Sequence, residues 1–225
     1  MSEVLRQPRL VVFDLDGTLQ DTYLWWPAVL REGLRAFAAA TGLALREPGD
    51  DEANAVIGLA DEGVWAPWLP AEHRERWRDL RRTVLPREAD VVRSGRDFLY
   101  PGVRPLLRHL RSLGVRTAIA SNCRGVYLQA VLEGQGLGAL TDWHFCLDSP
   151  GVAVKADMVR LALEAAGTRR AVMVGDREND MAAARANALP FVWRRNGRGE
   201  VRGADALWDG APAHLLSILG LPGIT

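Results

Sequence analysis

Acidic residues follow two apolar runs that lie far apart in the chain. The run RLVVFDL breaks at Asp14, and Asp16 comes two positions later. The run AVMVG is followed by Asp176 and, four positions further on, by Asp180. Carboxylates that pack together need a cation, and a site with only oxygen ligands favours a hard ion such as Mg²⁺. The sequence therefore predicts a magnesium site if the two segments meet.

A hydroxyl and an amine stand at comparable places. Ser121, with Asn122 beside it, follows the apolar run VRTAIA, and Lys155 precedes a helical pattern that leads into the run AVMVG. Lys155 is the single lysine among 28 basic residues, so the general preference of this sequence for arginine does not explain it. A serine, a lysine and free backbone N–H groups suit the binding of a phosphoryl group.

The apolar runs are expected to be strands that bring these side chains together. Short continuous apolar runs are typical of strands buried on both faces of a parallel sheet. Such runs occupy residues 9–15, 115–120, 171–175 and 189–193, with a weaker one at 144–147. Helical patterns alternate with them, at residues 104–113, 126–133, 156–166 and 178–186. This alternation predicts a mostly parallel sheet whose strand carboxyl ends form the ligand-binding edge.

The segment 21–98 has a different character, because it contains no convincing buried strand. Helices are expected at residues 24–40, 51–59 and 71–84. Five of the eight tryptophans fall in this segment: Trp25, Trp26, Trp65, Trp68 and Trp77. We therefore predict an α/β fold in which a Rossmann-like parallel sheet core, residues 1–20 and 99–225, carries an inserted all-helical cap domain, residues 21–98.

Composition excludes several other classes of protein. The length of 225 residues suits one core with a smaller insertion, and 48% hydrophobic with 25% charged residues is ordinary for a globular protein. The 28 basic residues balance 28 acidic ones, so no basic excess indicates a nucleic-acid partner. There is no apolar run of 18 residues, so no membrane partner is expected. Two cysteines make a disulfide framework improbable and favour a cytoplasmic protein, as a monomer or a homodimer.

Four segments together resemble the haloacid dehalogenase superfamily. The run DLDGTL that starts at Asp14 is similar to the first motif of that family, and Ser121 within AIASN resembles the second. Lys155 resembles the third motif, and the run GDREND around Asp176 the fourth. All four occur in the family's order over essentially the whole chain, and the segment after the first motif resembles the family's small helical cap. The chain departs from the family after Lys155, where Ala156 stands in place of the usual prolines.

The resemblance implies a phosphatase mechanism. Asp14 is the expected nucleophile, which attacks phosphorus and forms an aspartyl-phosphate intermediate. Asp16 is the expected acid and base, which protonates the leaving oxygen and then activates water. Magnesium is the implied cofactor, held by the carboxylates of Asp14 and Asp176 and the backbone carbonyl of Asp16. Asp180 is implied as a further acidic group at the metal.

The same resemblance implies residues that bind the substrate, a small phosphorylated metabolite. Ser121 and Lys155 are expected to hold the phosphoryl oxygens, and Lys155 also to steady the nucleophile. Gly17 fits a place where the backbone approaches the phosphate closely. Thr18 and Asn122 complete the predicted set.

Each of these residues also has a purely structural interpretation. Asp14 and Asp16 suit a turn after a strand, since aspartate favours such positions. Ser121 suits the cap of the following helix, a role that is compatible with phosphate binding. Asp176 and Asp180 suit the positive end of a helix. The four motifs in register favour the catalytic interpretation.

Residues near the first motif separate the branches of the family. Asp16 disfavours dehalogenation, whose enzymes lack an acid at that position. A phosphonate-cleaving enzyme needs a cap lysine, and residues 21–98 contain none. The runs YPGV and VGD resemble phosphoglycolate phosphatase-type enzymes. A magnesium-dependent phosphomonoester hydrolase acting on 2-phosphoglycolate-like compounds, sugar phosphates or nucleotides is therefore expected, with a sugar phosphomutase or a non-catalytic binding scaffold as alternatives.

Overall fold

The structure, a computed structural model, describes residues 5–224, so residues 1–4 and 225 of the predicted core lie outside it. Two compact units are present. The core unit comprises the described residues up to Asp21, Leu99–Ser121 and those from Gly136 onward. The helical unit comprises Thr22–Phe98 and Asn122–Gln135.

The core unit contains the predicted parallel sheet. Its six strands run in the order β3-β2-β1-β4-β5-β6, and every neighbouring pair is parallel. Their bounds are β1 Leu10–Phe13, β2 Arg116–Ala120, β3 Trp143–Phe145, β4 Ala171–Gly175, β5 Phe191–Arg194 and β6 Ala206–Trp208. The predicted α/β, Rossmann-like class is confirmed. β3 was predicted only as the weaker run at 144–147, and β6, also three residues long, was not predicted.

The central strand β1 decides where the chemistry lies. All four of its residues are fully buried, as expected for a strand covered on both faces. The register pairs Phe13 with Ile119 of β2 on one side and with Val174 of β4 on the other. The residues that follow these three strands therefore meet at one edge of the sheet.

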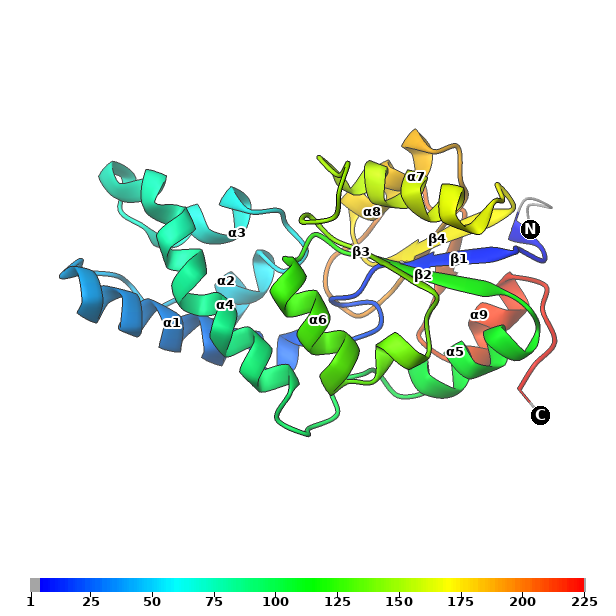
Figure 1. The fold of residues 1–225 in the computed structure, drawn as a ribbon, viewed down its shortest axis with the longest axis horizontal. Coiled ribbons are helices and arrows are strands. Elements are labelled where there is room, and N and C mark those ends of the chain that lie inside the picture. Colours follow the sequence, from blue (N-terminus) through cyan, green and yellow to red (C-terminus); the bar gives the residue numbers. More distant parts are fainter. Residues whose placement is uncertain (1–4, 225) are drawn as a thin grey trace. The chain divides into compact units, whose positions relative to one another are not determined.

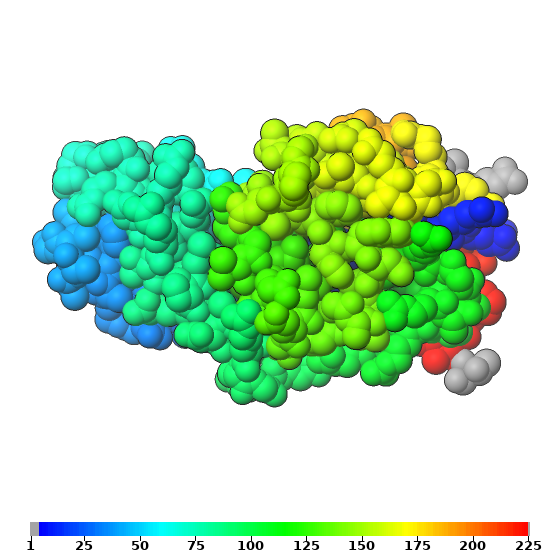
Figure 2. All heavy atoms as spheres, viewed as in Figure 1, coloured from blue at the N-terminus to red at the C-terminus, as the bar shows by residue number. Residues whose placement is uncertain are grey.

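Helices cover both faces of this sheet. The helices of the core unit are α5 Val103–Ser112, α7 Lys155–Ala166, α8 Glu178–Ala186 and α9 Pro212–Ile218, with the short 3₁₀ turn η5 Leu137–Ala139. α7 and α8 lie on one face and α5 and α9 on the other (Figure 1). Apolar side chains of α7 and α8, including Met158 and Val159, pack on β1, β2 and β4. In the space-filling view the surrounding segments hide most of the N-terminal strand (Figure 2).

The helical unit is built around aromatic side chains. Its helices are α1 Trp26–Thr41, α2 Asp50–Ala55, α3 Glu62–Trp65, α4 Trp77–Val92 and α6 Gly125–Gly134, with 3₁₀ turns η2 Thr22–Leu24, η3 Ala66–Trp68 and η4 Ala71–Arg76. Trp26 stacks edge-to-face on Trp25 and on Trp65, with ring centroids 6.4 and 5.7 Å apart. Its indole N–H donates to the carbonyl of Ala53 at 2.8 Å. All five tryptophans of this unit are buried, so they contribute large side chains to its interior.

The boundaries of the helical unit differ from the predicted ones in one respect. The division at residues 21–98 placed residues 122–135 in the core, whereas α6 packs against α4. Gln135 ties the end of α6 to this unit, since its side-chain amide donates to the carbonyls of Val92 and Arg96 and its oxygen accepts the N–H of Phe98. Contacts of this kind join segments some 40 residues apart, which periodicity does not reveal. No helix of the described residues is long and apolar enough to cross a membrane.

Candidate active site

Asp14 is the first residue beyond the central strand. Its backbone N–H continues the ladder to the carbonyl of Val174 at 2.9 Å, so its position is fixed by the sheet. The side chain is 3% exposed, and one carboxylate oxygen accepts a hydrogen bond from Nζ of Lys155 at 2.5 Å. The structure thus brings together the predicted nucleophile and the predicted phosphate-binding lysine, 141 positions apart in sequence.

Lys155 lies at the first position of α7 and is buried. Asp157 caps this helix end, because its carboxylate accepts the backbone N–H groups of Ala153 and Val154 at 2.9 and 3.1 Å. In the segment after Lys155, where the family usually has prolines, this chain thus has an aspartate that caps α7. The Lys155 ammonium also donates to Asp180, so one cation serves two carboxylates.

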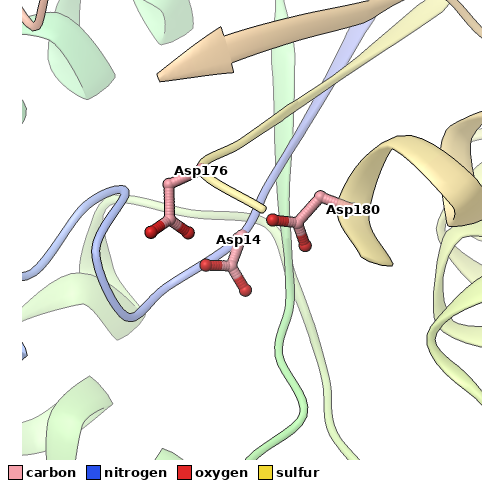
Figure 3. Close-up of side chains that lie close together, drawn as sticks. All are labelled: Asp14, Asp176 and Asp180. Carbon is pink, nitrogen blue, oxygen red and sulfur yellow. The ribbon is translucent and has the colours of Figure 1, made fainter. Parts of the chain in front are cut away.

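Asp176 and Asp180 come from the turn between β4 and α8. Asp180 lies in the first turn of α8, and its second oxygen accepts the backbone N–H of Arg177 at 3.0 Å. Oxygen atoms of Asp14, Asp176 and Asp180 all lie within 4.8 Å of one another, and Figure 3 shows the three carboxylates pointing toward a common space. Gly175 is required beside them, because a Cβ there would overlap the Asp180 side chain.

Burial makes the electrostatics of this cluster unfavourable without a further cation. Burial raises the pKa of Asp14 well above its usual range; Lys155 opposes this shift, while Asp180 and Asp176 add to it. Burial and then the charge of Asp180 raise the pKa of Asp176 to about 6. Burial disfavours the charged form of Lys155, but the two carboxylates outweigh it and raise the pKa of the ammonium above its usual range. Two of the three carboxylates, Asp14 and Asp180, share a single buried ammonium.

The loop after Asp14 turns tightly. Gly17 has a φ of +85°, which favours glycine, and a Cβ there would lie 2.9 Å from Cγ of Asp176. Asp16 is half-buried, and Oδ1 accepts a hydrogen bond from Gln20 at 3.5 Å. Its carboxylate is outside the acidic group found among the described residues. Thr18 is fully buried, and its hydroxyl has no hydrogen-bond partner among the described residues.

Ser121 and Asn122 follow β2 but take part in different units. Ser121 is buried and belongs to the core unit, where its backbone N–H donates to the carbonyl of Phe145 at 3.0 Å. Asn122 belongs to the helical unit, and its side-chain amide donates to the carbonyl of Gly58 at 3.0 Å. The side chain of Asn122, for which we expected a role in substrate binding, therefore already donates a hydrogen bond within the helical unit.

One residue at the site was not predicted. Asn196 lies two positions beyond β5 and donates from Nδ2 to Oδ2 of Asp176 at 2.8 Å and to the carbonyl of Gly17 at 3.0 Å. The signal that would have identified it is its place after a strand that pairs with β4, at the same edge of the sheet.

Comparison with known proteins agrees with this architecture. The family model of haloacid dehalogenase-like hydrolases matches residues 8–187, and the chain belongs to that family. A haloacid dehalogenase-like hydrolase from Streptococcus pneumoniae has the same fold, with a TM-score of 0.76 at 21% identity, over 93% of this chain and 97% of that one. The expected superfamily membership is confirmed.

Two curated relatives carry different names. The chain is 30% identical over 200 residues to a phosphoglycolate phosphatase of Agrobacterium fabrum, covering 81% of this chain and 78% of that protein. It is 29% identical over 195 residues to the tyrosine-protein kinase PtkA of Mycobacterium tuberculosis, covering 82% of this chain. The chain spans 61% of the length of that kinase.

Proposed function

We propose that this protein is a magnesium-dependent phosphatase that hydrolyses a small phosphomonoester through an aspartyl-phosphate on Asp14. The observation that carries the proposal is the contact of Asp14 with Lys155 at 2.5 Å, inside a buried group of three carboxylates at the carboxyl edge of a parallel sheet. The protein's membership of the hydrolase family supports the same class of reaction, and so does the chain's similarity to a protein named phosphoglycolate phosphatase.

The residues present fit a magnesium ion. Their donor atoms are all oxygens, which Mg²⁺ prefers, and the buried ammonium of Lys155 contacts two of the three carboxylates, those of Asp14 and Asp180. Asp14 and Asp176 are the proposed carboxylate ligands, with the backbone carbonyl of Asp16. Asp180 already accepts from Lys155 and from a backbone N–H, so we assign it to holding Lys155 and to the metal's outer surroundings. When bound, Mg²⁺ would offset the charge on the phosphoryl oxygens.

The chain's own groups supply the covalent steps. A carboxylate oxygen of Asp14 attacks phosphorus, the bond to the leaving oxygen breaks, and Asp16 gives that oxygen a proton. Asp16, now ionised, takes a proton from water, whose oxygen attacks phosphorus and releases Asp14 and inorganic phosphate. Ser121 and the Lys155 ammonium hold the phosphoryl oxygens, and the fixed position of the ammonium needs no rearrangement during the reaction.

The substrate class we propose is small phosphorylated metabolites, of which 2-phosphoglycolate, sugar phosphates and nucleoside monophosphates are the first candidates. The test is inorganic phosphate release across such a panel with Mg²⁺, with chelator, and with Asp14→Asn. We expect turnover that disappears with chelator and with the variant. Transfer of phosphate back to a sugar, with none released, would instead support a phosphomutase. Folded, metal-loaded protein that does neither would support a binding scaffold.

A further inference from the structure

Asn196 connects two parts of the site that come from different strands. It follows β5, whereas its partners Asp176 and Gly17 follow β4 and β1. Both hydrogens of its amide are used, on Oδ2 of Asp176 at 2.8 Å and on the carbonyl of Gly17 at 3.0 Å. The Asn196 side chain therefore links the turn that carries Asp176 to the loop that begins at Asp14.

Three hydrogen bonds determine the orientation of the Asn196 amide. Oδ1 accepts the backbone N–H of Arg198 at 2.9 Å, while Nδ2 faces two acceptors. A flipped amide would place an oxygen against the Asp176 carboxylate and the Gly17 carbonyl, which is repulsive. Only asparagine among side chains of this size supplies two donors and one acceptor in this arrangement, since aspartate has no donor when ionised and leucine has none at all.

The three groups are also packed closely around Gly17. A Cβ on Gly17 would lie 2.9 Å from Cγ of Asp176 and 3.0 Å from Nδ2 of Asn196. The loop backbone, the carboxylate and the amide thus leave no space between them. The separation of the Asp14 loop from Asp176 is therefore fixed by hydrogen bonding through Asn196 as well as by the pairing of β1 with β4.

We propose that Asn196 is a positioning residue that aims the Asp176 carboxylate at the space it shares with Asp14, and so sets the affinity for Mg²⁺. This inference rests on the proposed metal site. Two buried carboxylates repel each other in the absence of metal, and the amide, a hydrogen-bond donor on the oxygen of one of them, holds that carboxylate in place. Removing a side chain that hydrogen-bonds to a metal ligand typically weakens metal binding about 10- to 100-fold.

The test is direct Mg²⁺ binding by calorimetry, without substrate, on the full chain and on Asn196→Ala. We expect binding about 10- to 100-fold weaker in the variant. Asn187→Ala is the matched control. Asn187 is also half-buried and also donates from Nδ2 to two acceptors, the carbonyls of Ala156 and Ala183 at 2.9 Å each, away from the acidic group. Its loss should leave Mg²⁺ binding unchanged.

The outcomes separate the inference from the proposed function. Wild-type protein that binds no Mg²⁺, or binds it equally well in Asp176→Asn, would contradict the metal site itself. Wild-type binding that is lost in Asp176→Asn but unchanged in Asn196→Ala would overturn only the positioning role. An equal loss in the Asn196 and Asn187 variants would indicate general destabilisation and would also overturn it. Asn196→Ser, which keeps one donor, should bind with intermediate affinity and serves if the alanine variant does not fold.

Discussion

Two charged clusters in this protein have opposite compositions. At the edge of the sheet, three carboxylates lie close together, and two of them, Asp14 and Asp180, share the ammonium of Lys155, whose side chain is 5% exposed. In the helical unit, the carboxylate of Asp61 is shared by two guanidinium groups, those of Arg81 at 2.7 Å and Arg124 at 3.4 Å. In the first cluster the carboxylates outnumber the ammonium and all are buried, while in the second one carboxylate contacts two guanidinium groups and is partly open to water.

The difference shows what each cluster is suited to do. Water screens the excess charge around Asp61, whose side chain is 34% exposed, so that cluster is stable without a partner. The carboxylates of Asp14, Asp176 and Asp180 lack such screening, and burying them costs stability unless a cation arrives. A site that is unfavourable until it is occupied is expected where function rather than folding has selected the residues.

The largest expected effect comes from removing one carboxylate at the sheet edge. Asp14→Asn should lower kcat for phosphate release by about 10⁴-fold or more, because it removes the nucleophile. The same change should raise the stability of the metal-free protein, because the remaining two carboxylates are closer to balance with Lys155. Phosphate release and urea unfolding in chelator measure the two effects. A variant that loses activity and also loses stability would break the comparison.

A second prediction concerns the same cluster and removes its positive charge in place of a negative one. Lys155→Met removes the cation that contacts the buried carboxylates of Asp14 and Asp180 and should destabilise the metal-free protein by about 3–5 kcal/mol. Arg81→Met is the matched change in the helical unit, where Asp61 keeps Arg124 as a partner. Its expected cost is about 1 kcal/mol or less. Equal losses in urea unfolding would show that burial does not distinguish the clusters.

The sequence predicted the residues of the first cluster because each stands beside a strong pattern. Asp14 and Asp176 directly follow buried strands, and Lys155 begins a helix, so parallel topology alone brings them to one edge. Asn196 was not predicted, since it does not directly follow β5 and an asparagine in a loop has many ordinary explanations. Its role depends on two hydrogen bonds to residues 20 and 179 positions away.

The second cluster was not predicted for a related reason. Arg124 belongs to the helical unit only because α6 packs on α4, a contact between distant segments. Asp61 has a φ of +36°, which is unusual for a residue other than glycine and is invisible to hydrophobic periodicity. The charge pattern of the sequence showed balanced numbers of acids and bases, but not which of them meet.

The stability of the metal-free protein should depend on pH through the carboxylates at the sheet edge. The pKa of Asp176 is raised to about 6 in the fold, so the folded protein holds this proton more tightly than the unfolded chain does. The stability that this proton contributes is fully present below the unfolded pKa and is lost as the pH rises through about 6. The difference between a pKa of about 6 and the ordinary value of about 4 corresponds to roughly 3 kcal/mol of folding stability. Asp176→Asn should therefore match the wild type near pH 4 and exceed it by that order of magnitude at pH 8.

Urea unfolding in chelator at pH 4, 5, 6, 7 and 8 measures this difference. Subtracting the wild-type stability from that of the variant cancels the titration of carboxylates that do not interact with Asp176, such as Asp205, whose pKa is lowered by Arg185 despite its partial burial. A difference that stays constant over the whole range would contradict the raised pKa of Asp176. Added Mg²⁺ should reverse the sign at pH 8, because only the wild-type site is expected to bind it.

The smallest expected effect is the same substitution made in the helical unit. Asp61→Asn keeps a residue that tolerates the positive φ, and it removes the charge that Arg81 and Arg124 share. The two guanidinium groups then repel each other without a carboxylate between them, and we expect a loss of about 0.5–1 kcal/mol. Urea unfolding at low salt and in 1 M NaCl checks this, since salt should remove most of the loss from a partly exposed cluster. The sign is opposite to that of Asp14→Asn, so a stabilised Asp61→Asn would show that the two clusters do not differ in the way their charges imply.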